Sequence, residues 1–221
     1  LQGAADGENL CLVRGIWHYA LAQRVRTRIC GRSARYRRVG IGFVIRRRNT
    51  TRVASWAHPF GCNRHRSYPR KAGQLGLLAV SIPEKYHGLG MGFNTGMLIC
   101  EEISSLTGSL ATAFGAHTGI GTLPILLYGT EEQKNYYLPK ISSGEWISCY
   151  NLTEPDAGSD ANSGKTKAIL TSDGEHYEIT GQKIWISNAG FAHVFIVFAR
   201  IEDDKNITGF ILQKEMDGIN L

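Results

Sequence analysis

The patterning of the chain changes near Gly144 from helical to strand-like, and this order restricts the fold more than any other feature. Before it, apolar residues recur at the helical spacing i, i+4, i+7 and i+11, as Ile99, Ile103, Leu106 and Leu110. After it, short apolar runs alternate with turn sequences such as "TSDGE" at 171–175, which is typical of hairpins. The pattern predicts an α+β fold in which a helical domain, 70–144, precedes an antiparallel β domain, 145–221, rather than alternating βαβ units.

Local signals place individual elements within these two parts. Thr130 followed by Gln133 matches a capping box and predicts a helix over "EEQKNYYL", ended by Pro139. Strands are expected over six apolar runs: 146–152, 165–170, 176–180, 183–187, 192–200 and 207–213.

Charge is distributed very unevenly along the chain. Residues 1–83 carry fifteen arginines and one lysine against two acids, whereas the remainder carries nine basic and seventeen acidic residues. Three interpretations of the basic segment, 1–69, stay open: a nucleic-acid footprint, an organelle transit segment, or a non-native or disordered end from another reading frame. The excess of arginine over lysine and the lack of sustained periodicity favour the last, so no nucleic-acid partner is expected.

Composition also bears on membranes, metals and compartment. The stretch Ile103–Thr130 has no charged residue, but its five glycines and eight serines or threonines make it too polar for a membrane span, so buried helices are expected. The five cysteines are scattered and odd in number, which suits a reducing compartment. His58, Cys62 and His65 lack a partner pair at zinc spacing, so no metal site is predicted.

Two segments carry the candidate chemistry: "YNLTEPDAGSD" at 150–160 and "WIS" at 185–187. The first opens from an apolar run into small and hydroxyl residues that expose backbone N–H groups. Such a surface suits a flat heteroaromatic ring whose edge carries acceptors. Trp185 adds an aromatic face and Ser187 another hydroxyl. A polar turn beside a core tryptophan remains the alternative.

These segments resemble the two flavin-contacting motifs of the acyl-CoA dehydrogenase family, in the same order and at a similar separation. "GLLAVSIPEKYHGLG", "AFGAHTGIGTLPILLYGTEEQKNYYLPKISSGEW" and "VFARI" resemble that family too, so the likeness covers about residues 70–221. It implies an N-terminal helical domain, a middle β-barrel and a C-terminal helical bundle. It also implies FAD-dependent oxidation of acyl-CoA to enoyl-CoA and electron transfer to an electron-transferring flavoprotein. A homo-oligomer is expected, cytoplasmic in a bacterium or in the mitochondrial matrix of a eukaryote, and not integral to a membrane.

Position by position, the resemblance implies seven cofactor-binding residues: Tyr150, Leu152, Thr153, Ser159, Trp185, Ile186 and Ser187. Thr153 would lie at the N1/O2 edge of the flavin, Trp185 over one face of the ring, and Ser187 near N5. Ser159 would also reach toward the CoA part of the substrate. His117 lies in a helix that borders the acyl cavity in relatives, and a packing role is favoured for it.

Two departures from the family qualify the resemblance. The segment 1–69 does not look like the family's N-terminal helices, and the chain stops at Leu221, before the bundle that supplies the catalytic base. We therefore expect a partial sequence without a catalytic residue of its own, inactive in isolation. The alternatives are an acyl-CoA oxidase or a flavin monooxygenase on the same scaffold or, in a different class, a nucleic-acid-binding protein acting through its basic segment.

Overall fold

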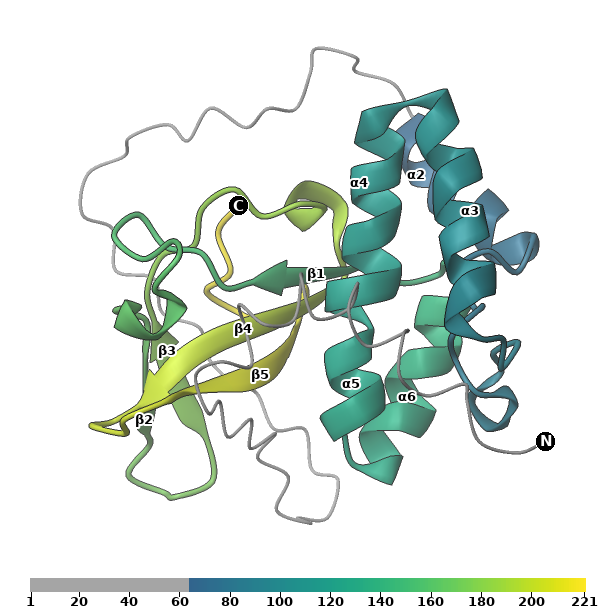
Figure 1. Cartoon of the computed structure of the whole chain (residues 1–221). Helices are drawn as coiled ribbons and strands as arrows, with labels where there is room; N and C mark the ends of the chain where they lie inside the picture. The colour runs from purple at the N-terminus through teal and green to yellow at the C-terminus, as the bar shows by residue number, and fades with distance from the viewer. Residues whose placement is uncertain (1–63) are drawn as a thin grey trace, which may run out of the picture.

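The computed structural model describes residues 64–221, in which a group of helices lies beside a five-stranded sheet (Figure 1). The helices are α2 (Arg64–Gln74), α3 (Phe93–Leu106), α4 (Gly108–Gly115), α5 (Leu123–Tyr128) and α6 (Glu131–Ser142), and a π-helical segment, η2 (Ala116–Gly121), joins α4 to α5. The strands are β1 (Ser148–Asn151), β2 (Lys167–Leu170), β3 (Tyr177–Thr180), β4 (Val194–Ile201) and β5 (Ile207–Gln213). Three short 3-10 turns complete the set: η1 (Glu84–Tyr86), η3 (Ala161–Ser163) and η4 (Ala189–Phe191).

The helical part confirms the predicted cap and corrects two predicted helix ends. The Thr130 hydroxyl accepts from the Gln133 N–H at 3.2 Å, and the Gln133 side chain accepts from the Thr130 N–H at 2.9 Å. α6 runs past Pro139 to Ser142, so the proline does not end it. The helical spacing from Ile99 to Leu110 predicts one continuous helix, and this prediction is also wrong. Thr107 has an extended backbone (φ −169°, ψ 136°). This residue ends α3 and precedes the first residue of α4, Gly108.

The sheet is mixed, which corrects the prediction of an antiparallel domain. β4 pairs parallel with β1 and β2 along one edge and antiparallel with β5 along the other, while β2 and β3 form an antiparallel hairpin. Strands joined by tight turns pair antiparallel, as expected. β1 and β2 instead meet β4 after long connections, and periodicity gives the place of a strand without its partner.

The segment 183–187 forms no strand, which corrects a second prediction. Trp185 has φ 57° and Asn188 has φ 70°. Left-handed backbone at these two residues cannot continue a pleated strand, so the apolar alternation of "KIWIS" belongs to a loop.

Alternation along β4 joins the helical and strand parts through a shared core. On one face Val194, Ile196 and Phe198 pack with Leu138 and Ile141 of α6. On the other face, residues such as Phe195 and Val197 pack with β2, β3 and β5. Both faces of β4 are therefore buried, and the helices cover one of them (Figure 1).

The run Gly108–Tyr128 is long and apolar enough to cross a membrane by length and composition alone. In the structure it is divided among α4, η2 and α5, and two of its polar side chains, His117 and Thr122, are buried. Thr122 donates to the His117 carbonyl at 2.6 Å, and His117 contacts Ser148 of β1. A third of its most apolar stretch is buried within the described residues, and its buried His117 bonds to another part of the fold.

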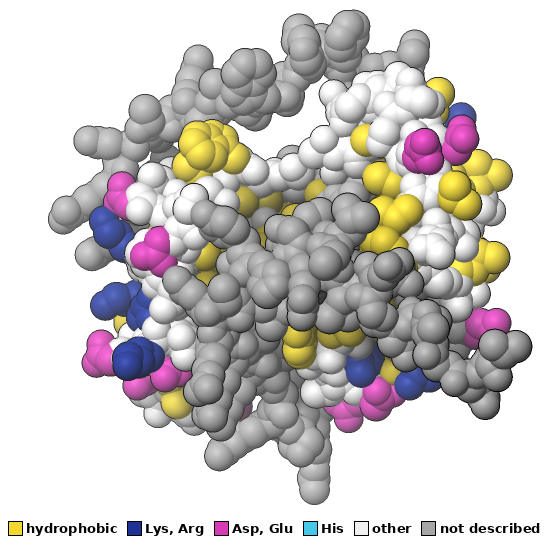
Figure 2. All heavy atoms as spheres, viewed as in Figure 1, with side chains coloured by type: hydrophobic (Ala, Val, Ile, Leu, Met, Phe, Trp, Pro, Cys, Tyr) yellow, Lys and Arg dark blue, Asp and Glu magenta, His cyan; other side chains and the backbone are white. Residues whose placement is uncertain are grey.

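Apolar side chains gather on the outer surface of the helical half (Figure 2). On α3, Leu98 is 63% exposed and Leu106 is 73% exposed, while Ile103 is buried. The apolar surface of α3 is thus only partly covered within residues 64–221.

Two predictions fall largely outside the described residues. These are the character of the segment 1–69 and the absence of a metal site at His58, Cys62 and His65, of which His58 and Cys62 are not described. Arg64–Gln74 forms α2, so the last residues of the basic segment belong to a helix that continues beyond it.

Candidate flavin site

The two motif segments lie side by side, as expected from the sequence. β1 ends at Asn151 and leads directly into Leu152 and Thr153. The Thr153 carbonyl accepts from the Ile184 N–H at 3.0 Å, which brings the first motif next to the residue that precedes Trp185.

A buried carboxylate organises the loop between these segments. Glu154 accepts from the Lys183 ammonium at 2.6 Å, from the Lys165 N–H at 2.6 Å and from the Thr166 N–H at 3.2 Å. Lys183 also donates to the Leu152 carbonyl at 3.1 Å. The side chains of Glu154 and Lys183 are 6% and 11% exposed, so this ion pair is held away from water.

The hydrogen bonds around Glu154 favour its carboxylate form. Burial opposes ionisation of Glu154, but the hydrogen bonds from Lys183, Thr166 and Lys165 outweigh it and hold the pKa of this carboxyl below its ordinary value. Burial lowers the pKa of Lys183, and the contact with Glu154 offsets part of that effect. A carboxylate with this many donors is a structural anchor rather than a free base.

Next to this anchor lies an exposed surface that fits a flat ring. Trp185 is 81% exposed, although a large aromatic side chain is usually covered. Thr153 is half-buried and Ser187 is exposed, and within residues 64–221 neither hydroxyl forms a hydrogen bond with the protein. An exposed indole and two hydroxyls without protein partners in the described residues are the kinds of group that contact a flat heteroaromatic ring with acceptors on its edge.

The other predicted cofactor-binding residues are placed differently. The Tyr150 ring packs against Phe198 with centroids 4.8 Å apart, and burial raises its pKa to about 12. Leu152 packs on the core shared with the helices, and Ile186 packs on the opposite face of the sheet. Ser159 is exposed in the loop after β1, and no hydrogen bond in the described part of the chain ties it to the other motif residues.

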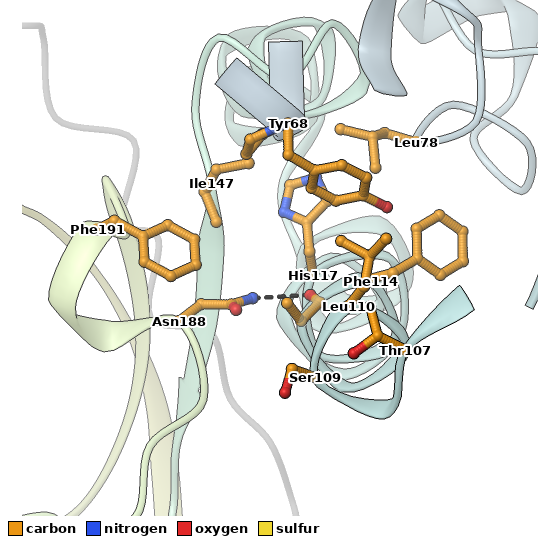
Figure 3. Close-up of a pocket in the computed structure, with 12 residues that line it drawn as sticks. Tyr68, Leu78, Thr107, Ser109, Leu110, Phe114, His117, Ile147, Asn188 and Phe191 are labelled. Atoms are coloured by element: carbon orange, nitrogen blue, oxygen red, sulfur yellow. Dashed lines mark hydrogen bonds between the residues drawn. The ribbon is translucent and has the colours of Figure 1, made fainter. Parts of the chain in front are cut away.

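A cavity of about 260 Å³ adjoins the second motif (Figure 3). It lies between α2, α4 and the turn after Ser187, and its wall is mainly apolar, with residues such as Tyr68, Phe114 and Phe191. Asn188 closes one side by donating to the Ala113 carbonyl at 2.9 Å. The turn that carries Ser187 is thereby fixed to α4.

His117 lines this cavity and has a structural role, in line with the packing role favoured from the sequence. Its Nδ1 accepts from the Ser148 N–H at 3.1 Å, and its Nε2 lies 3.2 Å from the Ile141 carbonyl. A carbonyl can only accept, so the proton sits on Nε2. Burial lowers the pKa of His117 to about 4, and the ring is neutral near pH 7.

Glu154, Lys183 and Asn188 organise the site but were not among the predicted site residues. The available signal was three acids in the first motif, Glu154, Asp156 and Asp160, and one base, Lys183, next to the second. Opposite charges in two segments expected to adjoin are candidates for a pair, but burial decides whether they form one.

Comparisons with known proteins agree with this geometry. The family model "Acyl-CoA dehydrogenase, N-terminal domain" matches residues 44–145, and "Acyl-CoA dehydrogenase, middle domain" matches residues 149–221. The first match begins within the basic segment 1–69.

Individual relatives are similar over about two thirds of this chain. A probable acyl-CoA dehydrogenase of Bacillus subtilis is 50% identical over 151 residues, which cover 68% of this chain and 25% of the relative. The mitochondrial isovaleryl-CoA dehydrogenase of Pongo abelii is 38% identical over 160 residues, covering 70% and 37%. The crystal structure of an acyl-CoA dehydrogenase from Bacillus anthracis complexed with FAD is 46% identical, with a TM-score of 0.66, covering 69% and 26%. The chain thus spans about a quarter to two-fifths of the length of these relatives.

Proposed function

The chain belongs to the acyl-CoA dehydrogenase family, and we propose that it supplies the flavin-side half of an FAD-dependent α,β-dehydrogenation of acyl-CoA to enoyl-CoA. The juxtaposition of Thr153 with the segment 184–187 is the observation that carries this proposal. The solved relative complexed with FAD supports the choice of cofactor.

When bound, FAD supplies an electron-accepting isoalloxazine ring. Trp185 would cover one face of that ring. The Thr153 hydroxyl would donate to the N1/O2 edge, where donors fixed in advance stabilise the charge that develops on reduction, and the Ser187 hydroxyl would lie near N5. Ser159 would reach toward the CoA part of the substrate or the phosphates of the cofactor. Tyr150, Leu152 and Ile186 would contribute mainly by fixing the backbone of the two motifs through their packing.

Removal of the substrate α-proton requires a base, and Glu154 is unsuited to that task. Its carboxylate already accepts hydrogen bonds from Lys183 and from two backbone N–H groups. A base must instead lie within hydrogen-bond reach of the substrate and be free to take a proton. We propose that the base belongs to residues outside this chain and that the chain is part of a longer protein.

The relatives support a proposal for the cellular setting. They include bacterial and mitochondrial proteins, which fits a soluble enzyme of the cytoplasm or the mitochondrial matrix. We propose an electron-transferring flavoprotein as the electron acceptor and a homo-oligomer as the functional form of the complete protein.

The test compares the 221-residue chain with a chimera that continues after Leu221 with the remaining residues of the Bacillus subtilis relative. Both proteins receive FAD and a series of acyl-CoA thioesters, and dye reduction is followed. We expect turnover from the chimera and none from the chain alone, which should bind FAD weakly. Turnover by the chain alone would show that it contains a base, and failure of the folded chimera to bind FAD would refute the proposal. Peroxide production in air without the dye would instead indicate an oxidase.

A further inference from the structure

We propose that the Glu154–Lys183 ion pair positions the flavin-contacting residues, beyond its contribution to stability. This inference rests on the proposed function, because it takes Thr153, Trp185 and Ser187 as the residues that meet the ring. Neither Glu154 nor Lys183 would touch the reacting atoms, so each is a positioning residue.

The pair joins three segments that are distant in sequence. Glu154 directly follows Thr153, and Lys183 lies two residues before Trp185. Their 2.6 Å contact is reinforced by the bond from Lys183 to the Leu152 carbonyl and by the bond between Ile184 and Thr153. The carboxylate also holds the third segment through the backbone N–H groups of residues 165 and 166.

The segment 185–187 is held at both of its ends. Lys183 and Ile184 fix the end before Trp185, and Asn188 fixes the other end by its bond to Ala113 of α4. Trp185 itself has φ 57°, a conformation that is unfavourable for a bulky residue unless its surroundings impose it. Loss of the ion pair would release one end and allow the indole and the Ser187 hydroxyl to move relative to Thr153.

The same loop contains a matched control pair. Lys165 and Asp156 also meet at 2.6 Å, but their side chains are 75% and 66% exposed. This pair belongs to the loop without joining it to the second motif. Asp156→Asn therefore removes a charge from the loop and leaves the proposed positioning contact intact.

The experiment measures FAD binding by the chimera, which carries the whole 221-residue chain, by titration and by the flavin absorbance bands, well below the melting temperature of each variant. Glu154→Gln and Lys183→Met should weaken FAD binding about tenfold or more and shift the flavin bands. Asp156→Asn should bind like the wild type. Ile103→Ala, which leaves a cavity in the core of the helical part, where no residue of either motif packs, should lower the melting temperature but leave the FAD dissociation constant unchanged.

If Glu154→Gln or Lys183→Met fails to fold, Lys183→Arg takes its place. Arginine keeps the charge but cannot place one nitrogen between Glu154 and the Leu152 carbonyl in the same way, so we expect a shifted flavin band and binding weakened about threefold. Wild-type affinity in folded Glu154→Gln or Lys183→Met, or equal weakening by Ile103→Ala at matched stability, would overturn the positioning role. No FAD binding by the folded chimera without substitutions would overturn the proposed function, and the positioning role with it.

Discussion

Two buried polar networks join distant parts of this molecule. One is built on an ion pair and the other on a neutral side chain. In the loop after β1, the ionised pair Glu154–Lys183 joins the two motifs. Between helices and sheet, the neutral ring of His117 joins η2 to Ser148 of β1 and to Ile141 of α6.

The partners explain the difference. Glu154 faces N–H donors only, two from backbone and one ammonium, so a full negative charge is well satisfied there. His117 faces a donor at Nδ1 and an acceptor at Nε2, which a neutral imidazole matches and a doubly protonated one does not. A buried group therefore carries a charge only where its partners are of one polarity. This rule predicts which changes the two networks tolerate.

The largest effect is expected from removing one member of the ionic network. Lys183→Met leaves the buried Glu154 carboxylate without its counter-ion, which costs about 3–5 kcal/mol in comparable buried pairs. The free energy of unfolding from urea titration measures this loss. Adding Glu154→Gln should cost much less in the Lys183→Met background than in the wild type, because the pair is lost only once. Additive losses would mean that the two side chains are not coupled.

The neutral network should make the free energy of unfolding depend on pH. Its histidine has a folded pKa of about 4 against the ordinary 6.5, so the unfolded chain binds more protons between these values. Stability from His117 is complete above about pH 6.5 and is lost as the pH falls toward 4, by about 3 kcal/mol in total. Urea titrations across this range measure the slope, which His117→Gln should flatten. An unchanged slope in that variant would place the titration elsewhere.

Glycines packed against each network allow a third prediction, with a smaller expected change in stability. A Cβ at Gly121 would lie 2.5 Å from the Ser148 Oγ, and one at Gly164 would lie 2.9 Å from the Glu154 Oε1. Alanine at either position should cost about 1–3 kcal/mol by displacing these partners. Gly119 is the matched control, since its Cβ would meet nothing within 4 Å. Gly119→Ala should raise the free energy of unfolding by about 0.5–1 kcal/mol. Equal losses at all three glycines would mean that the backbone conformation alone, and not contact with the networks, sets the cost.

The sequence predicted where elements lie better than how they pair. The Thr130 capping box and the β2–β3 hairpin depend on neighbouring residues, and both are found. The parallel contacts of β4 with β1 and β2 depend on long connections and were predicted as antiparallel. Local chemistry specifies a cap or a tight turn, whereas strand order is settled by packing of the whole sheet.

The site shows the same division. Adjacency of the two motifs followed from their resemblance to a known pair, but the strand expected over 183–187 is a loop with left-handed backbone at Trp185. The roles of Glu154 and Lys183 could not be predicted, because a charged residue in a loop is usually solvated and only burial makes these two an anchor. Pattern reasoning therefore located the candidate site and missed what holds it in shape.

The smallest effect should come from the exposed pair in the same loop. Asp156 and Lys165 meet at the same 2.6 Å as Glu154 and Lys183, yet both are largely solvated. Water and salt screen an exposed pair, and fixing two mobile side chains opposes the attraction. Asp156→Asn should therefore leave the urea midpoint unchanged within error, at low and at high salt, while Lys183→Met lowers it at both. A large loss from Asp156→Asn would mean that contact distance, rather than burial and the polarity of the partners, sets the strength of these networks.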